Sequence, residues 1–428
     1  MAQATGDNLS RRTTFEMTTV LATERENLFA SGAFVRLWGV GVITNVTLWF
    51  EVLAASLFTL QVTGSGFAVA LVTAARAAPL LVVGAPAGVL SDAWDRKKIV
   101  LAGLLISAGS AGVVSALAWI GCLEPLHVGL AALVSGVVYA TEMPARRRMI
   151  AESAGDGQVD RAIAADSLTG YAARCVGPIL GGWAYQTTGL AGAFFASSMC
   201  SLVALAFAIG LEHRQVLRRL AWGAVRTDLF DAVRFAALRP TLLMLLAVTF
   251  TMNVCGYSYT TLIAPVAKLG FDLDATQTGF LAAAEPGGAF LGGLLLMRLE
   301  LPGLRILWLM TGVLILTGGL VATATAGLAG LPFIGICAVL ACAGIGSAIY
   351  TNNQTSIVMA ETPPALRSRM FGLVTIVIGS WPFGMLLAGA LVSVLSPLVA
   401  MATLGLLGIA CIGSLATVRH FRLAEDRP

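Results

Sequence analysis

Four ionisable residues lie deep inside apolar runs of this 428-residue sequence: Glu51, Arg76, Arg174 and Glu285. A charge in such a segment is costly unless it is paired or functional. Burial favours the protonated form of a carboxyl group, whereas a nearby arginine favours the ionised form. These residues could therefore form fixed ion pairs between helices, or one glutamate could take up and release a proton. Both interpretations stay open.

The depths of the four residues suggest how they pair. Glu51 lies about 17 residues into its run and Arg76 about 15 residues from the same end of the next run, which places both roughly 25 Å from that end. Arg174 and Glu285 lie about 13 and 14 residues from the equivalent ends of their runs. We therefore expect the pairs Glu51–Arg76 and Glu285–Arg174, with Glu51 as the first choice for a proton-coupling site.

The composition indicates an all-α membrane protein. The chain is 57% hydrophobic and 12% charged, with a mean hydropathy of +0.85, whereas soluble domains are about 25% charged. Crossing the hydrocarbon core takes roughly 20 apolar residues. Twelve such runs are predicted as transmembrane helices, near 34–60, 66–91, 98–121, 126–144, 161–187, 191–211, 241–267, 276–297, 304–326, 329–350, 367–395 and 398–418.

The basic residues predict the orientation. If both termini are cytoplasmic, all Lys and Arg except Lys268, Arg76 and Arg174 fall in or beside cytoplasmic segments. Positive residues are enriched on the cytoplasmic side of membrane proteins. The net charge of +4 therefore reflects topology and does not indicate nucleic-acid binding.

The turn after the second run carries a recognisable charged motif. Residues 84–98 read GAPAGVLSDAWDRKK. The stretch resembles the signature loop of the major facilitator superfamily, G-x-L-[AS]-D-x-x-[GD]-R-[KR]-[KR], which ties helices together during conformational change. The residues carried over as this motif are Gly88, Asp92, Asp95, Arg96, Lys97 and Lys98.

A second motif, GPILGG, lies in the fifth run. It resembles the G-P-x-x-G-G sequence of the superfamily's drug–proton antiporters. Gly177, Gly181 and Gly182 allow close helix packing, and Pro178 interrupts the backbone hydrogen bonds. The same residues could serve helix packing without antiport, so that alternative stays open.

Further sequence segments resemble one family within the superfamily. FVRLWGVGVITN, MPARRRMIAES, ARCVGPILGG and LRSRMFGLVTIVIGSWPFGMLLAG are similar to the third drug–proton antiporter family, which includes siderophore exporters and macrolide efflux proteins. This likeness covers about residues 34–418. In length and general texture the chain also resembles the major-facilitator porters of magnetosome membranes, which are associated with iron supply.

An internal repeat supports two six-helix bundles. Thr44-Asn45-Val46 matches Met252-Asn253-Val254, and Ala151-Glu152-Ser153 matches Ala360-Glu361-Thr362, at nearly one offset. Parallel repeats of this kind occur in major facilitators, with the substrate site between halves. The predicted parts are a cytoplasmic tail (1–33), a first bundle (34–211), a linker with an amphipathic basic helix (212–240), a second bundle (241–418) and a cytoplasmic tail (419–428).

Polar side chains in the first, fourth, seventh and tenth runs are candidates for the substrate cavity, although each could instead join helices. They are Asn45, Tyr139, Asn253, Tyr257, Tyr350, Asn352, Asn353 and Gln354. The histidines and cysteines show no metal-ligand spacing. No nucleophile–base constellation is present, so the sequence predicts neither an enzyme nor a bound cofactor or metal.

Taken together, these features favour a secondary transporter that works by alternating access, as a monomer in a bacterial inner membrane. The resemblance implies proton-coupled export of a small organic solute or siderophore-like compound. One alternative is a porter of iron or an iron chelate into a compartment such as the magnetosome. An alternative of another class is a transport-inactive membrane scaffold or sensor.

Overall fold

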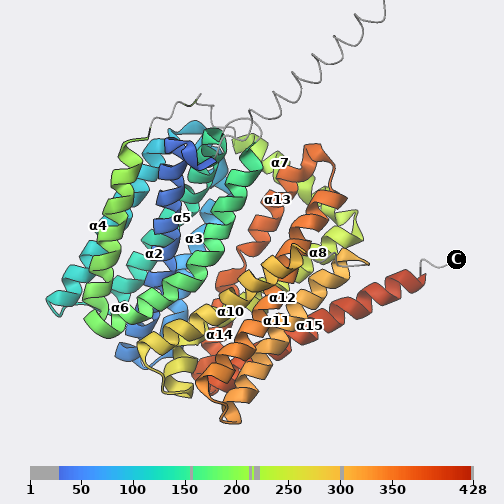
Figure 1. The fold of residues 1–428 in the computed structure, drawn as a ribbon. Helices are drawn as coiled ribbons and strands as arrows, with labels where there is room; N and C mark the ends of the chain where they lie inside the picture. Colours follow the sequence, from blue (N-terminus) through green and yellow to red (C-terminus); the bar gives the residue numbers. More distant parts are fainter. Residues whose placement is uncertain (1–27, 155–157, 212–214, 216–221, 299–302, 426–428) are drawn as a thin grey trace, which may run out of the picture.

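The computed structural model of the chain describes residues 28–154, 158–211, 215, 222–298 and 303–425. In this part of the chain, helices account for the regular structure and no strand occurs. Figure 1 shows two bundles, the N-terminal half in blue to green and the C-terminal half in yellow to red, which pack side by side. The all-α membrane fold predicted from the sequence is confirmed.

The N-terminal half supplies six membrane crossings. A short 3-10 turn, η1 (Leu28–Ala30), precedes its long helices, which are α2 (Gly32–Thr63), α3 (Gly66–Ala93), α4 (Arg96–Trp119), α5 (Pro125–Ser153) and α6 (Val159–Ile209). If α6 were straight, its 51 residues would extend for about 76 Å, far more than a bilayer core of about 30 Å. The backbone leaves helical geometry at Gly189 (φ 68°, ψ −172°), so α6 forms the fifth and sixth crossings.

Both ends of α6 lie at one end of the molecule. Its first residue follows α5 closely, and the carbonyl oxygen of its last residue, Ile209, accepts a hydrogen bond from Lys97 Nζ at 2.9 Å. We call this end, which also carries the run Arg146–Arg148, the basic end, and the opposite one the far end. That the basic end faces the cytoplasm remains a prediction from charge.

The C-terminal half is entered through α7 (Trp222–Ala237), which lies within the predicted linker and contacts both α3 and α13. Figure 1 shows α7 at the basic end, between the halves. The remaining elements are α8 (Pro240–Thr251), η2 (Met252–Gly256), η3 (Tyr257–Leu262), α9 (Ile263–Pro265), η4 (Val266–Gly270), α10 (Ala275–Leu296), α11 (Arg305–Leu328), α12 (Phe333–Glu361), α13 (Pro364–Ile378), α14 (Trp381–Val394) and α15 (Pro397–Glu425).

Two crossings expected to be continuous helices are irregular. The run 241–267 passes from α-helix into π-helical and 3-10 turns, and the run 367–395 breaks at Gly379–Ser380. Proline lacks the backbone N–H that an α-helix needs four residues after each carbonyl. Pro265 and Pro382 therefore each remove one such bond, and the backbone rearranges near them.

Among the side chains that the structure describes, the apolar cluster that joins both halves lies toward the far end. Leu57 and Leu60 of α2 pack in one cluster with Leu262 and Ile263 of the C-terminal half. Toward the basic end the described residues form two separate clusters, one around Phe34 and Leu104 and another within the C-terminal half. The described side chains thus pack the halves together at the far end and form a separate core in each half toward the basic end.

Candidate functional site

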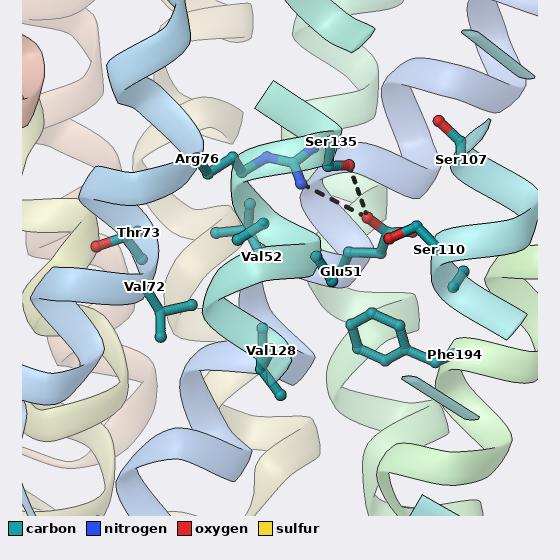
Figure 2. A pocket seen from close by; sticks show the side chains of 14 residues that line it. Glu51, Val52, Val72, Thr73, Arg76, Ser107, Ser110, Val128, Ser135 and Phe194 are labelled. Carbon is teal, nitrogen blue, oxygen red and sulfur yellow. Dashed lines mark hydrogen bonds and ion pairs between the residues drawn. The ribbon is translucent and has the colours of Figure 1, made fainter. Parts of the chain in front are cut away.

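Glu51 lies against a small cavity inside the N-terminal half that both polar and apolar side chains line (Figure 2). Its carboxylate is 3.5 Å from the Arg76 guanidinium and accepts hydrogen bonds from Ser135, at 3.4 Å, and Ser197. The cavity, of about 20 Å³, is lined only by residues of the N-terminal half, including Ser110. Because a serine hydroxyl can donate or accept, this site can satisfy both the ionised and the protonated carboxyl group.

The structure places Glu51 away from the interface between the halves. Glu51 faces the interior of its own half, whereas Trp49 on the same helix lines a cavity together with Thr260 and Trp381 of the C-terminal half. Two residues correspond to about 200° of helical rotation, so these side chains point in nearly opposite directions. A coupling role for Glu51 therefore has to act through a partner.

A second small cavity leads from Glu51 toward the basic end. It has a volume of about 40 Å³, shares Glu51, Arg76 and Ser135 with the first, and is also lined by Tyr139 and Glu142. Polar side chains therefore line a continuous stretch from Glu51, in the centre of the N-terminal half, to Glu142 on α5.

Glu142 begins a buried charge network that was not predicted from the sequence. Arg146 Nε donates to Glu142 at 2.9 Å, and Arg146 Nη1 donates to Asp166 at 2.5 Å. Asp166 also accepts from Arg147, which is half exposed. Two features of the sequence could have indicated this network. Glu142 and Arg146 are four residues apart, a spacing at which side chains on a helix meet, and an aspartate lies at the start of the fifth apolar run.

The second predicted pair joins the two halves. Arg174 Nη2 of α6 lies 3.4 Å from Glu285 of α10. Glu285 is fully buried and also accepts hydrogen bonds from the hydroxyls of Tyr259, at 3.0 Å, and Ser347. The Arg174 guanidinium lies 5.3 Å from the centroid of the Trp49 ring, so it contacts residues of both halves.

A cavity of about 630 Å³ extends from this pair toward the basic end. α6 lines it with Ser167 and Tyr171, and α10 and α12 line it from the opposite half. Its position agrees with the division of the apolar core, which leaves the halves unsealed at that end. A volume of this size is within the range of small-molecule sites.

The predicted cavity residues divide into two groups. Tyr257 and Asn352 line the large cavity, and Tyr139 lines smaller ones. The others do not line the large cavity. Their polar groups bond to nearby groups on the helices: Asn45 to Gly41 O at 2.7 Å, Asn253 to Thr249 O at 2.9 Å, Asn353 to Ile349 O at 2.9 Å, and Gln354 to Tyr350 Oη at 2.5 Å.

The described part of the signature loop stabilises the start of α4 and connects it to the end of α5, at the basic end. Asp95 caps α4 by accepting from the backbone N–H of Lys97, at 2.9 Å, and of Lys98, at 3.4 Å. Arg96 is buried and pairs with Glu152 at the end of α5. Gly88 and Asp92 lie in the last turns of α3, and the surroundings of Gly88 and the side chain of Asp92 are outside the described part of the chain.

The GPILGG motif is a contact point between helices of both halves. A Cβ atom at Gly177 would lie 2.8 Å from Val46 O of α2, and one at Gly181 would lie 2.6 Å from Phe50 O. Gly182 instead faces Ala275 and Gly279 of α10, across the interface. Glycine is required here by the close approach of backbones, and Pro178 is buried beside it.

Replacing Gly182 with alanine is expected to weaken the seal at the far end. Its Cβ would lie 3.1 Å from the Ala275 carbonyl carbon and overlap the carbonyl oxygen. Overpacking of this kind costs about 1–3 kcal/mol. A lower thermal unfolding midpoint and increased labelling of a cysteine at Leu57 would report the change. Gly170→Ala on the same helix, where nothing lies within 4 Å, is the control; an equal effect of both would contradict the steric explanation.

Comparison with known protein families gives a match over nearly the whole chain. A family described as "Transmembrane secretion effector" matches residues 27–427. The multidrug efflux pump Tap of Mycolicibacterium fortuitum is 27% identical over 357 residues, which cover 78% of this chain and 82% of Tap. The enterobactin exporter EntS of Escherichia coli is 27% identical over 354 residues, covering 78% and 80%.

Solved structures share the fold at lower identity. The nucleoside transporter NupG superposes with a TM-score of 0.69 at 14% identity, covering 91% of this chain and 98% of NupG. A bacterial homologue of the lysosomal transporter Spinster, solved in an inward-facing and occupied conformation, gives a TM-score of 0.68 at 15% identity, covering 92% and 96%. At these identities the likeness concerns the fold alone.

Proposed function

The chain belongs to the transmembrane secretion effector family of major-facilitator transporters, and on that premise we propose that it exports a small organic molecule from the cytoplasm. Both termini would be cytoplasmic, in a bacterial inner membrane, and the protein would act as a monomer. The observation that carries the proposal is the cavity of about 630 Å³ between the halves, which extends toward the basic end while the far end is packed shut. With the basic end in the cytoplasm, this is the inward-facing state of an alternating-access cycle.

Proton coupling is the second part of the proposal, and Arg76 is its central residue. Arg76 pairs with Glu51 inside the N-terminal half and also lines a cavity of about 90 Å³ between the halves. When Glu51 takes up a proton, the attraction that holds the guanidinium is lost, and Arg76 can extend into the interface cavity. A proton on Glu51 and a substrate there would then oppose each other's binding, as antiport requires.

Two cavities within the N-terminal half, which share several polar side chains, support a separate path for the proton. They share Glu51, Arg76 and Ser107, and the second continues to Glu142. A proton could reach Glu51 from the basic end along this path without entering the 630 Å³ cavity.

Inside-out membrane vesicles test the proposed function directly, because export then becomes uptake. We expect vesicles containing the protein to accumulate enterobactin or 2-naphthoate when their interior is made acidic, and vesicles without the protein to show no such uptake. Ferric citrate serves as the probe for the iron-porter alternative. Uptake of ferric citrate alone would favour that alternative, and uptake of none of the three would favour a scaffold or sensor.

The iron-porter alternative has the weaker support. The two similar proteins described above are named as a drug efflux pump and an enterobactin exporter, and these names concern organic molecules. We therefore keep organic-solute export as the leading proposal.

A further inference from the structure

Three neighbouring cavities follow the interface between the halves. The 630 Å³ cavity shares Arg174 with a cavity of about 30 Å³, which in turn shares Trp49 and Thr260 with the 90 Å³ cavity. The 90 Å³ cavity lies against both irregular crossings, since Thr260 belongs to η3 and Trp381 begins α14 after the helix break. Irregular backbone at membrane depth is tolerated where it lines a cavity, and in transporters such positions mark substrate sites.

Two N–H donors along these cavities have no acceptor. Trp381 Nε1 and Arg174 Nε are buried, and neither makes a hydrogen bond within the described part of the chain. Trp381 lines the 90 Å³ cavity, and Arg174 lines the other two. A buried donor without a partner is unfavourable. Both atoms therefore point to a molecule that brings hydrogen-bond acceptors into the interface.

The charges around the cavities limit what that molecule can be. Among the described residues that line the three cavities, the charged ones are Arg76 and Arg174, and none is a carboxylate. Glu51 faces the interior of the N-terminal half, and Glu285 is fully buried beside Arg174. Each arginine has a carboxylate partner, but that partner does not line these cavities, which are lined by N–H donors of Arg76, Arg174 and Trp381. A molecule with acceptor oxygens is therefore favoured over an organic cation, which would find no carboxylate among the described lining residues.

Aromatic side chains define the shape of the preferred molecule. Trp49 and Trp381 line the 90 Å³ cavity together, and Tyr257 lines the large one. Flat aromatic surfaces bind planar groups by offset or edge-to-face stacking. Apolar residues such as Leu48 and Met385 complete the 90 Å³ cavity.

We propose that the substrate is a planar, uncharged or anionic aromatic compound whose oxygen acceptors are bound by Trp381 Nε1 and Arg174 Nε. This assignment names the substrate class and rests on the proposed export function. Trp381 is the residue that determines specificity for the acceptor, because its ring also stacks in the cavity. The protein would discriminate against organic cations.

The assignment can be tested by calorimetry, which measures how tightly three probes that share a naphthyl group bind to the purified full-length protein in detergent. We expect 2-naphthoate and 2-naphthamide to bind, and 2-naphthylmethylammonium to bind at least about tenfold more weakly, a difference that corresponds to about 1.4 kcal/mol. Preference for the cation would overturn the proposal, as would an absence of binding by all three probes.

Trp381→Phe keeps an aromatic ring and removes only the N–H. It is expected to weaken 2-naphthoate and 2-naphthamide binding by about threefold to tenfold, the range for one lost hydrogen bond. Trp119→Phe, which changes a largely exposed tryptophan, is the control and should have no effect. Arg174→Lys, which keeps the charge but removes Nε–H, should weaken the same two probes.

Unchanged binding in Trp381→Phe would overturn the role of Trp381. This outcome differs from a failure of the proposed function. If vesicles accumulate enterobactin while none of the naphthyl probes binds, export stands and the substrate class is wrong. If the probes bind as expected but no vesicle accumulates any compound, the site stands and export is wrong.

Discussion

Neutralising Arg174 is expected to destabilise the protein by up to about 3–5 kcal/mol, the usual cost of leaving one member of a buried ion pair without its partner. Arg174→Gln leaves the fully buried Glu285 with the hydroxyls of Tyr259 and Ser347 as its hydrogen-bond donors among the described residues. Glu285→Gln should cost less. The Arg174 side chain is 19% exposed toward the cavity, and its guanidinium stays between the Trp49 and Tyr257 rings.

The double variant, Arg174→Gln with Glu285→Gln, should recover much of the stability lost by Arg174→Gln, because no buried charge is then unpaired. The thermal unfolding midpoint of each variant in detergent is the measurement. Arg161→Gln, an exposed change near the start of the same helix, is the control and should have little effect. If the losses of the two single variants simply add in the double variant, the pair does not stabilise the interface as described.

Replacing Glu51 with glutamine is expected to remove the response of transport to a pH gradient while leaving exchange of substrate intact. The amide is close in shape to the protonated carboxyl group and can keep hydrogen bonds to Ser135 and Ser197. It cannot release a proton, so each transport cycle would lose its coupled ion. For one proton per substrate, a gradient of one pH unit is worth about 1.4 kcal/mol, or about tenfold in accumulation.

The response to pH is measured as accumulation of substrate in inside-out vesicles at several imposed pH gradients. Exchange of labelled for unlabelled substrate without a gradient measures whether the protein still carries substrate across the membrane. Asp160→Asn removes an exposed carboxylate at the start of α6 and should leave the pH response unchanged. A Glu51→Gln protein with a normal pH response would rule out the coupling role of Glu51. Loss of exchange together with the pH response would instead indicate that the Glu51–Arg76 pair is needed for the fold.

The two ion pairs differ in whether their members belong to the same half of the protein. Glu51 and Arg76 lie in the same half, so their contact need not break when the halves move. Arg174 and Glu285 lie in different halves, so a relative movement of α6 and α10 changes their separation directly. We therefore expect the interface pair to report conformation and the pair within the N-terminal half to report protonation.

Much of the fold and the approximate depth of the charges could be predicted from the sequence. Run length and the position of Lys and Arg are local properties, and they are enough to predict twelve crossings. Depth along a helix follows from residue number and the 1.5 Å rise. For that reason residue spacing could predict that Glu51 and Arg76, and likewise Arg174 and Glu285, lie at matching depths, and the structure places the members of each pair 3.5 Å and 3.4 Å apart.

The tertiary structure alone decided which way the side chains face. Whether Glu51 faces its own half or the interface depends on how α2 is rotated, and helix rotation is set by packing against residues distant in sequence, such as Ser197. The same holds for Asn353 and Gln354, whose polar groups have partners on the packed helices of the C-terminal half. The network of Arg146 and Asp166, and the Trp381 N–H that has no acceptor among the described residues, likewise arise only once separate helices meet. A linear sequence records distance along each helix, but neither the rotation of the helices nor the neighbours of each side chain.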